Sequence, residues 1–527
     1  MECARKRGNG RDAKCLPREG FRRATPDRSF VASRELIHVR TRFNLTRAGK
    51  STLWSSLLVA PMASSETPGA VDDRSDRFLS RKVLDARSSQ GASKVWAEVT
   101  ALARLPGVLD LGQGWPDFGA NDVARNAASD ALVRSPDPRA NQYSPITGAP
   151  ELLTAISRYY RATGSADVGT PLVTTSATEA LYVALQTLCD PGDVVVYLEP
   201  FFPWYAGHCR VLGLTARTVR LDRDEATNAF VLDVAKLGKA LEGAKVFVYN
   251  SPHNPTGLVL DRARVEAVAK LCVAEDVAVI ADEVYERCTF ADARFARIAD
   301  APGMAERTLT VGTASKLLCL SGWRVGWVCG PAALVSAVSS SHAYVTYCAP
   351  TPLQIGVAAA LDAISDEADA ATRARALKAA LEADAAESAR GGGGSAEVGE
   401  TGASSARRAA AKRAAEGAVT PDETAKTMAE NVAILAEALE ACGAKPCPPA
   451  GGYFLVADVA PLEMSAGAFV DALAKEARVA AVPLGVFYQG DVGDRGEEDT
   501  LVRFAVCKKR ETIEKCAAAI REFAPRR

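Results

Sequence analysis

The feature that most restricts the fold of this chain is an alternation of short apolar runs with helix-like stretches through its middle. Segments typical of helices, such as 178–189 and 262–276, separate several of the apolar runs. Strands that alternate with helices indicate an α/β fold built on a mainly parallel sheet with helices on both faces. The apolar runs cover residues 171–175, 193–200, 245–250, 277–282, 309–313 and 325–330.

Polar residues capable of chemistry follow these runs, where an α/β sheet binds its ligands. After the first run, Ser176, Ala177 and Thr178 open a helix-like stretch whose first N–H groups suit a phosphate. A serine or threonine at a helix start is also typical of an ordinary cap. After the second run comes FFPWY, residues 201–205, which either stacks on a flat heteroaromatic ring or packs in the core.

The third and fourth runs precede groups that suit the ring atoms of a pyridine. Asn254, in the tetrapeptide NPTG, can donate a hydrogen bond to a phenolate-like oxygen, and Tyr285 is placed to reach the same oxygen. Asp282 ends its run, and a partly buried carboxylate there can keep a ring nitrogen protonated. An aspartate at a strand end is also a common turn former, so this motif alone leaves both interpretations open.

The fifth run ends at Thr313, just before Lys316, and Arg324 lies eight residues beyond that lysine. A sheltered lysine beside other cations has a lowered pKa and becomes a nucleophile suited to a Schiff base. Thr313 and Arg324 can supply a hydroxyl and a guanidinium to a phosphate group. Taken alone, the motif is far more typical of a surface lysine near a structural arginine.

Together these groups describe a socket for a single molecule. They offer a carboxylate for a ring nitrogen, donors for a ring oxygen, an aromatic face, a phosphate anchor and a lysine for an aldehyde. The phosphorylated pyridine aldehyde with these parts is pyridoxal 5′-phosphate. The order and spacing of the motifs favour such a site over separate structural explanations for each motif.

With these motifs the chain resembles the class I/II aminotransferases of fold type I, over roughly residues 80 to 525. It is most similar to the kynurenine–oxoglutarate transaminase, glutamine transaminase K and cysteine-S-conjugate β-lyase group, with bacterial methionine aminotransferases beside it. The likeness also rests on LGQGWPDF, NQYSPITGAPEL, GGYFLVAD, VPLGVFY and LVRFAVCKK, which begin at residues 111, 141, 451, 482 and 501.

The resemblance implies a role for each matching residue. Lys316 would form the Schiff base and move protons, Asp282 would pair with the pyridine nitrogen, and Asn254 and Tyr285 would contact the ring oxygen. The remaining implied contacts are Phe202 stacked on the ring, Ala177, Thr178, Thr313 and Arg324 on the phosphate, Tyr143 of a second subunit on that phosphate, Arg503 on the substrate carboxylate, and Gly114, Trp115 and Asn254 around the substrate.

The resemblance also implies a reaction and a partner. The expected enzyme is a homodimeric aminotransferase that moves an amino group from a donor of the kynurenine, glutamine, methionine or aromatic type to a 2-oxo acid, with ping-pong kinetics. Cysteine-S-conjugate β-lyase and aspartate-type aminotransferase are the alternatives. Where relatives often place a histidine after an aromatic residue, this chain has Tyr347-Cys348, which leaves an aromatic preference open. A ligand-sensing module is disfavoured, because the head lacks a helix-turn-helix pattern.

The fold implied by the resemblance has a large domain, with a mainly parallel seven-stranded sheet, and a smaller α+β C-terminal domain. A Gly-rich, low-complexity insert at about 383–417 has no counterpart in the family pattern. The expected divisions are a disordered or targeting head at 1–78, an N-terminal arm at 79–125 that contributes to the small domain, the large domain at 126–355 and the small domain at 356–527.

Composition limits the partners of the chain. A net charge of −1 gives no sign that nucleic acid or an anionic membrane is the main partner. No apolar run approaches the roughly 18 residues of a membrane span. The 13 cysteines and four histidines show no metal-site spacing, so we expect no metal. Scattered cysteines predict reduced thiols in the cytoplasm, or in a mitochondrion or plastid if the basic head is a transit peptide.

Overall fold

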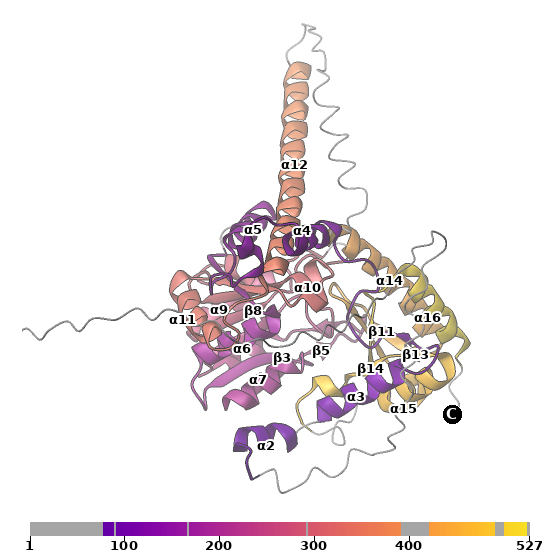
Figure 1. Cartoon of the computed structure of the whole chain (residues 1–527). Coiled ribbons are helices and arrows are strands. Elements are labelled where there is room, and N and C mark those ends of the chain that lie inside the picture. The colour runs from indigo at the N-terminus through magenta and orange to yellow at the C-terminus, as the bar shows by residue number, and fades with distance from the viewer. Residues whose placement is uncertain are drawn as a thin grey trace, which may run out of the picture. The chain divides into compact units, whose positions relative to one another are not determined.

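A sheet of seven strands lies at the centre of the described part of the chain (Figure 1). β10 runs antiparallel to its two neighbours, and all other neighbouring pairs are parallel, which confirms the expected mainly parallel sheet. In spatial order the strands are β2 (Thr170–Thr174), β10 (Gly326–Gly330), β9 (Thr308–Thr313), β8 (Ala278–Asp282), β7 (Val246–Asn250), β3 (Val194–Glu199) and β4 (Thr215–Arg220).

The computed structural model describes residues 77–88, 91–165, 168–290, 293–390, 421–490 and 500–523. The chain divides into two units, residues 1–71 and 72–527, and every described residue belongs to the second. The predicted head at 1–78 therefore lies almost wholly outside the described residues, and its targeting role stays a prediction.

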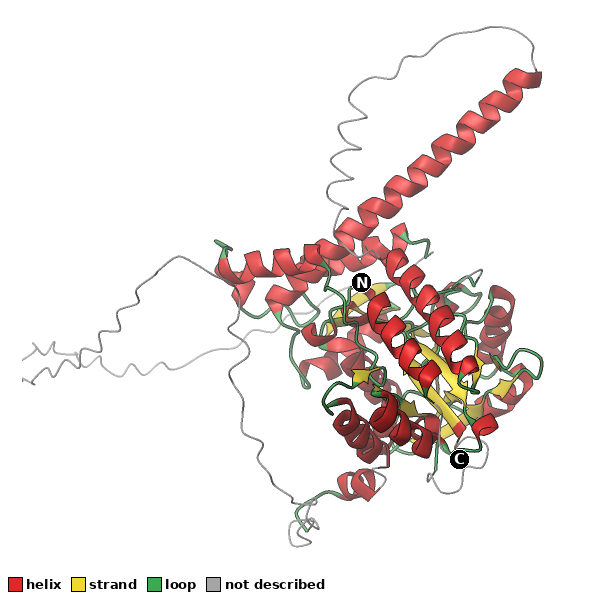
Figure 2. Cartoon of the chain, turned by 90° about the vertical axis from the view of Figure 1, so that its right-hand side faces the viewer, coloured by secondary structure: helices red, strands yellow, loops and turns green. Residues whose placement is uncertain are grey.

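Helices cover both faces of the large sheet (Figure 2). Strand β7 is buried at every residue, as expected for a strand with helices above and below it. Helices α8 and α9 pack on one face, and α6, α7 and α11 pack on the other. Their bounds are α6 (Ser176–Leu188), α7 (Trp204–Leu212), α8 (Val234–Leu241), α9 (Arg262–Ala274) and α11 (Ala332–Ala343).

A second, antiparallel sheet organises the C-terminal part, and helices pack with it around one apolar core. Early residues join this part, because β1 (Leu109–Asp110) pairs in parallel with β13 (Val479–Ala480). The α+β character is therefore confirmed, whereas the domain limits stay predictions. In order the strands are β11 (Lys445–Cys447), β12 (Phe454–Asp458), β15 (Leu501–Ala505) and β14 (Val482–Pro483), and the helices are α14 (Pro421–Ala441), α15 (Ala466–Ala472) and α16 (Arg510–Glu522).

Helix α12 (Thr351–Arg390) packs on α4 (Asp122–Val133) and α5 (Pro150–Ala162), and then extends away from them (Figures 1 and 2). Arg158 of α5 forms ion pairs with three aspartates of α12 that are spaced four and three residues apart: Asp362, Asp366 and Asp369. The helix covers the start of the predicted insert at 383–417, and residues 391–417 lie outside the described residues. The other elements are α2 (Arg81–Ser88), α3 (Gly91–Ala103), α10 (Ala314–Leu317), β5 (Asp222–Arg223) and β6 (Phe230–Val231).

The described residues contain no helix that is long and apolar enough to cross a membrane. Within the same residues, no group of three or more histidine, cysteine, aspartate or glutamate side chains is arranged to hold a metal ion.

We predict that Gly312→Ala destabilises the large sheet by about 1–3 kcal/mol, because it overpacks a filled core. Gly312 of β9 faces Trp327 of β10, and an added Cβ would lie 2.2 Å from the indole Nε1. That nitrogen donates to the Tyr160 hydroxyl at 2.9 Å. Thermal unfolding of the purified variant measures the effect.

The matched control is Gly467→Ala on α15, where an added Cβ meets no atom within 4 Å. Alanine also favours a helix over glycine, so this variant should unfold at or above the wild-type temperature. Equal midpoints for the two variants would show that the β9–β10 contact is loosely packed.

Candidate cofactor and substrate site

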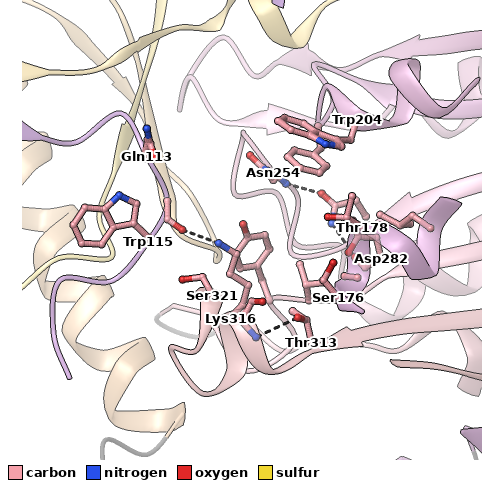
Figure 3. A pocket seen from close by; sticks show the side chains of 18 of the residues that line it. Gln113, Trp115, Ser176, Thr178, Trp204, Asn254, Asp282, Thr313, Lys316 and Ser321 are labelled. Carbon is pink, nitrogen blue, oxygen red and sulfur yellow. Dashed lines mark hydrogen bonds between the residues drawn. The ribbon is translucent and has the colours of Figure 1, made fainter. Parts of the chain in front are cut away.

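A cavity of about 700 Å³ opens where several strands of the large sheet end, at the position that the sequence predicts (Figure 3). Most of the residues predicted for the site line it, although they come from segments far apart in the chain. Those residues are Gly114, Trp115, Ala177, Thr178, Phe202, Asn254, Asp282, Tyr285, Thr313, Lys316, Arg324 and Arg503.

Lys316 projects from the short helix α10, which begins directly after β9. Thr313 caps that helix, its hydroxyl oxygen accepting a hydrogen bond from the Ser315 backbone N–H at 3.1 Å. The Lys316 ammonium donates to the Gly114 carbonyl at 2.6 Å. Burial is the largest effect that lowers the pKa of Lys316, and the charge of Arg503 acts in the same direction. The amine is therefore easier to deprotonate than a lysine in water, as a nucleophile requires.

Asp282 ends β8 and is buried on the floor of the cavity. The Tyr205 hydroxyl donates to Oδ2 at 2.5 Å, while Oδ1 has no hydrogen-bond partner among the described residues. Burial raises the pKa of Asp282 to about 6, against the opposing effect of the Tyr205 hydrogen bond. A buried carboxylate oxygen without a donor is costly, and a protonated ring nitrogen is the kind of donor that would satisfy it.

Asn250, the last residue of β7, fixes two of the predicted contacts at once. Its Oδ1 accepts from the Asn254 backbone N–H at 2.7 Å, and its Nδ2 donates to the Asp282 carbonyl at 2.8 Å. The loop that carries Asn254 is thereby tied to the strand that carries Asp282. Tyr285 lies three residues beyond Asp282 and also lines the cavity. The structure thus brings the predicted ring contacts together.

The N-terminus of α6 supplies the predicted anion site. Ser176 has a φ of +78°, and Gly326 of β10 approaches it so closely that an added Cβ would lie 2.5 Å from the Ala177 nitrogen. Arg324 lines the cavity and donates a hydrogen bond to the Ser321 carbonyl at 3.1 Å. Backbone N–H groups at a helix start beside a guanidinium suit a phosphate.

Arg503 of β15 reaches the cavity from the second sheet, with its side chain buried. It donates to the Gly112 carbonyl at 2.7 Å and to Asn254 Oδ1 at 3.3 Å, while its Nε has no partner among the described residues. The guanidinium lies 3.9 Å from the Phe454 ring centroid and 4.6 Å from that of Phe487. Burial lowers the pKa of Arg503 to about 10, so it stays charged at neutral pH.

Three aromatic predictions need comment. Phe202 lines the cavity, and Trp204 stacks on it at a centroid distance of 4.9 Å and an interplanar angle of 10°. Tyr143 and Tyr347 do not line the cavity of their own chain. They form an edge-on pair at 5.3 Å and are 81% and 47% exposed. Both tyrosines are therefore available to a second chain.

Several residues of the site went unassigned in the sequence analysis, and three of them stand out by their contacts or by an unpartnered polar atom. Trp96 of α3 lines the cavity, and its buried indole N–H has no partner among the described residues. Ser315, whose buried hydroxyl is likewise unpartnered, directly precedes Lys316 and could have been found from that position. Tyr205 stands in the predicted aromatic group, but only the fold shows that it holds Asp282. No local pattern marks Trp96.

Comparisons with known proteins agree with this geometry. The sequence model of the family "Aminotransferase class I and II" matches residues 106–391 and 384–520. A Mycobacterium tuberculosis protein named probable N-succinyldiaminopimelate aminotransferase is 32% identical over 82% of this chain and 97% of its own length. Human kynurenine–oxoglutarate transaminase 3 is 28% identical over 85% of this chain and 92% of its own length.

Solved structures show the same likeness. N-succinyldiaminopimelate aminotransferase from M. tuberculosis superposes with a TM-score of 0.66 at 31% identity, covering 81% of this chain and 96% of that one. Aspartate aminotransferase from Thermus thermophilus with maleate gives a TM-score of 0.64 at 26% identity, covering 84% and 98%. Enzymes named for different amino donors therefore share this fold.

We predict that Tyr205→Phe moves the acidic limb of the rate profile of amino transfer to higher pH. The Tyr205 hydrogen bond lowers the pKa of Asp282, so its loss raises that pKa further. A carboxyl that is protonated over a wider range below neutral pH cannot hold a charged ring nitrogen. Because a hydrogen bond to a charged group is worth about 1.5–3 kcal/mol, the limb should move by about one to two pH units.

Tyr197→Phe is the matched control, because the buried Tyr197 hydroxyl has no partner among the described residues. Its ring lies 5.9 Å from that of Tyr205, so the two substitutions disturb the same region. Rates measured from pH 5 to pH 9 should show a displaced limb for Tyr205→Phe alone. Superimposable profiles for the two variants would remove Tyr205 from this role.

Proposed function

The chain belongs to the class I and II aminotransferases, and on that basis we propose that its amino donor has a long, uncharged side chain of the glutamine, methionine, kynurenine or aromatic kind. The family is dependent on pyridoxal phosphate and passes the amino group to a 2-oxo acid in two successive half-reactions. The observation that carries the assignment of the site is the meeting of Lys316, Asp282 with a free oxygen, and the α6 N-terminus in one cavity.

The described residues fit the cofactor at each end. The unpartnered Asp282 Oδ1 suits its ring nitrogen, Tyr285 and Asn254 suit its ring oxygen, and the α6 N-terminus with Arg324 suits its phosphate. When bound, pyridoxal 5′-phosphate supplies an electron-poor ring that accepts the electrons of the bond broken at the substrate Cα.

The chain's own residues then bind the substrate and move its proton. Arg503 holds the substrate carboxylate with a planar fork of donors. Burial helps to deprotonate Lys316 Nζ, which takes the proton from the substrate Cα in the first half-reaction. In the second half-reaction Nζ delivers a proton to Cα of the new amino acid. Trp96, Phe202 and Phe454 line the cavity and limit its contact with water.

The lining of the cavity supports an uncharged donor side chain. Its cations are Lys316, Arg324 and Arg503. Each already has a role in this proposal: Lys316 moves the Cα proton, Arg324 contacts the phosphate and Arg503 binds the substrate carboxylate. Among the described lining residues, no further cation is left for a distal carboxylate. The unpartnered Trp96 indole N–H can instead donate to an uncharged acceptor, such as an amide or ketone oxygen.

We further propose that the active unit is a dimer of this chain. Tyr143 and Tyr347 form an edge-on pair whose side chains are 81% and 47% exposed, and exposed aromatic rings that lie together are typical of a surface that a partner covers. A second copy that covers them would bring Tyr143 to the neighbouring phosphate site. Sedimentation of the holoenzyme tests this arrangement.

Carbon–sulfur lyase activity is the second candidate, because the same loss of a Cα proton can expel a leaving group from the β-carbon. Product analysis distinguishes the two. Transfer leaves a 2-oxo acid with the side chain intact, whereas elimination from a cysteine conjugate releases pyruvate, ammonia and a thiol.

We predict that Lys316→Ala abolishes amino transfer and the cofactor adduct that borohydride fixes to the protein. The surface substitution Lys270→Ala on α9 is the control and should leave both unchanged. Turnover and mass spectrometry of the reduced protein provide the two measurements. A fixed adduct in Lys316→Ala at the wild-type level would assign the Schiff base to another lysine.

We predict that Arg503→Lys raises KM for every donor by tenfold or more. An ammonium cannot reproduce a two-bond fork, and each lost charged hydrogen bond costs about 1.5–3 kcal/mol. Arg510→Lys, at an exposed ion pair on α16, is the control. Steady-state kinetics with glutamine, methionine, phenylalanine and aspartate as donors would also rank them, and a preference for aspartate would falsify the proposed donor class.

A further inference from the structure

The loop 112–117, which carries the sequence GQGWPD, is held by cations at successive points along its backbone. Three side chains from distant parts of the chain donate to three of its carbonyl oxygens. The bonds are Arg503 to Gly112 at 2.7 Å, Lys316 to Gly114 at 2.6 Å and Lys508 to Trp115 at 2.8 Å.

Two of these three cations have duties in the reaction. Lys316 must leave the Gly114 carbonyl when its amine takes part in chemistry, and Arg503 must share its donors with the substrate carboxylate. Lys508 does not line the cavity, so it takes no direct part in the reaction. Its bond is therefore the one of the three that can persist through the whole catalytic cycle.

Lys508 is itself firmly seated. The residue is 1% exposed, and its ammonium lies 3.9 Å from the Trp115 ring centroid as well as on the Trp115 carbonyl. Asn431 of α14 donates to the Lys508 carbonyl at 2.7 Å. One side chain thus fixes both the backbone and the ring of Trp115, from a position behind the cavity wall.

Two further hydrogen bonds hold the other end of the loop 112–117. The Lys509 backbone N–H donates to Asp117 at 2.5 Å, and the Thr512 hydroxyl donates to the same carboxylate at 2.6 Å. The start of α16 therefore holds the far end of the loop. Trp115 stands between this anchor and the cavity, with 43% of its surface exposed.

We propose that Lys508 is a positioning residue that sets donor specificity by keeping Trp115 in place as part of the cavity wall. A donor with a long side chain reaches this wall and gains from its rigidity, whereas alanine ends near Cβ and does not. The inference rests on the proposed amino transfer, because it concerns which donors that reaction accepts. Lys508 acts through Trp115 and touches neither the substrate nor the cofactor.

The test compares Lys508→Met with Lys509→Met in the holoenzyme. Both remove one positive charge, but the Lys509 side chain is exposed and the substitution keeps the backbone N–H that donates to Asp117, so this variant should leave kinetics unchanged. For Lys508→Met we expect KM for methionine and phenylalanine to rise about tenfold, as loss of a charged hydrogen bond allows. KM for alanine and all kcat values should change less than threefold, and Lys508→Arg should recover most of the loss.

A second readout follows Trp115 itself without turnover. Acrylamide quenching of the Trp115 emission, taken as the difference between each protein and its Trp115→Phe derivative, should increase in Lys508→Met and not in Lys509→Met. An equal rise in KM for alanine and for long donors in Lys508→Met, or unchanged quenching of Trp115, would overturn the proposal. If Lys508→Met does not fold, Trp115→Ala must abolish the preference for long donors over alanine, and a retained preference overturns the proposal as well.

These outcomes also separate the inference from the function on which it rests. A wild-type holoenzyme that transfers no amino group from any donor refutes the proposed reaction, whatever Lys508→Met does. A wild-type enzyme that transfers normally, with Lys508→Met indistinguishable from it, refutes the role of Lys508 alone.

Discussion

Exclusion of water from ionisable groups is the physical constraint on which this site depends. Burial lowers the pKa of Lys316, which helps the amine act as a base and nucleophile. The same burial raises the pKa of Asp282 to about 6, which works against a carboxylate that must stay charged. The Tyr205 hydroxyl partly offsets that effect, so a side chain on α7 makes one dry cavity compatible with both requirements.

The residues that strand patterning could locate lie at or just after the ends of strands, whereas Gly114, Trp115 and Arg503 were expected only from the family resemblance. Thr178, Asn254, Asp282 and Lys316 were predicted together because parallel strands deliver their carboxyl ends to one edge of a sheet. Local apolar patterning also located six of the seven strands, but not β4 (Thr215–Arg220). The antiparallel direction of β10 carries no signal in the patterning, since a strand buried on both faces looks alike in either direction.

The contacts that sequence could not reveal join side chains across long separations. Tyr205 and Asp282 are 77 residues apart, and Lys508 and Trp115 are 393 apart. In each case the flanking sequence gives no sign that the side chain has a distant hydrogen-bond partner, because many residue types could fill the same buried position. Trp96 is a further case, because only the folded structure shows that its indole N–H is buried beside the cavity and has no partner among the described residues.

The two halves of the site lie on different parts of the fold, and this division explains how one architecture serves many donors. The groups that fit the cofactor follow strands of the large sheet, where Asn250 ties neighbouring loops to one another. The residues proposed to contact the substrate lie on β15 and in the loop 112–117, and the backbone of that loop accepts hydrogen bonds from Arg503 and Lys508. A change in that loop can alter the donor without moving Asp282 or Lys316. Enzymes named for succinyldiaminopimelate, kynurenine and aspartate are all similar to this chain, at 26–32% identity.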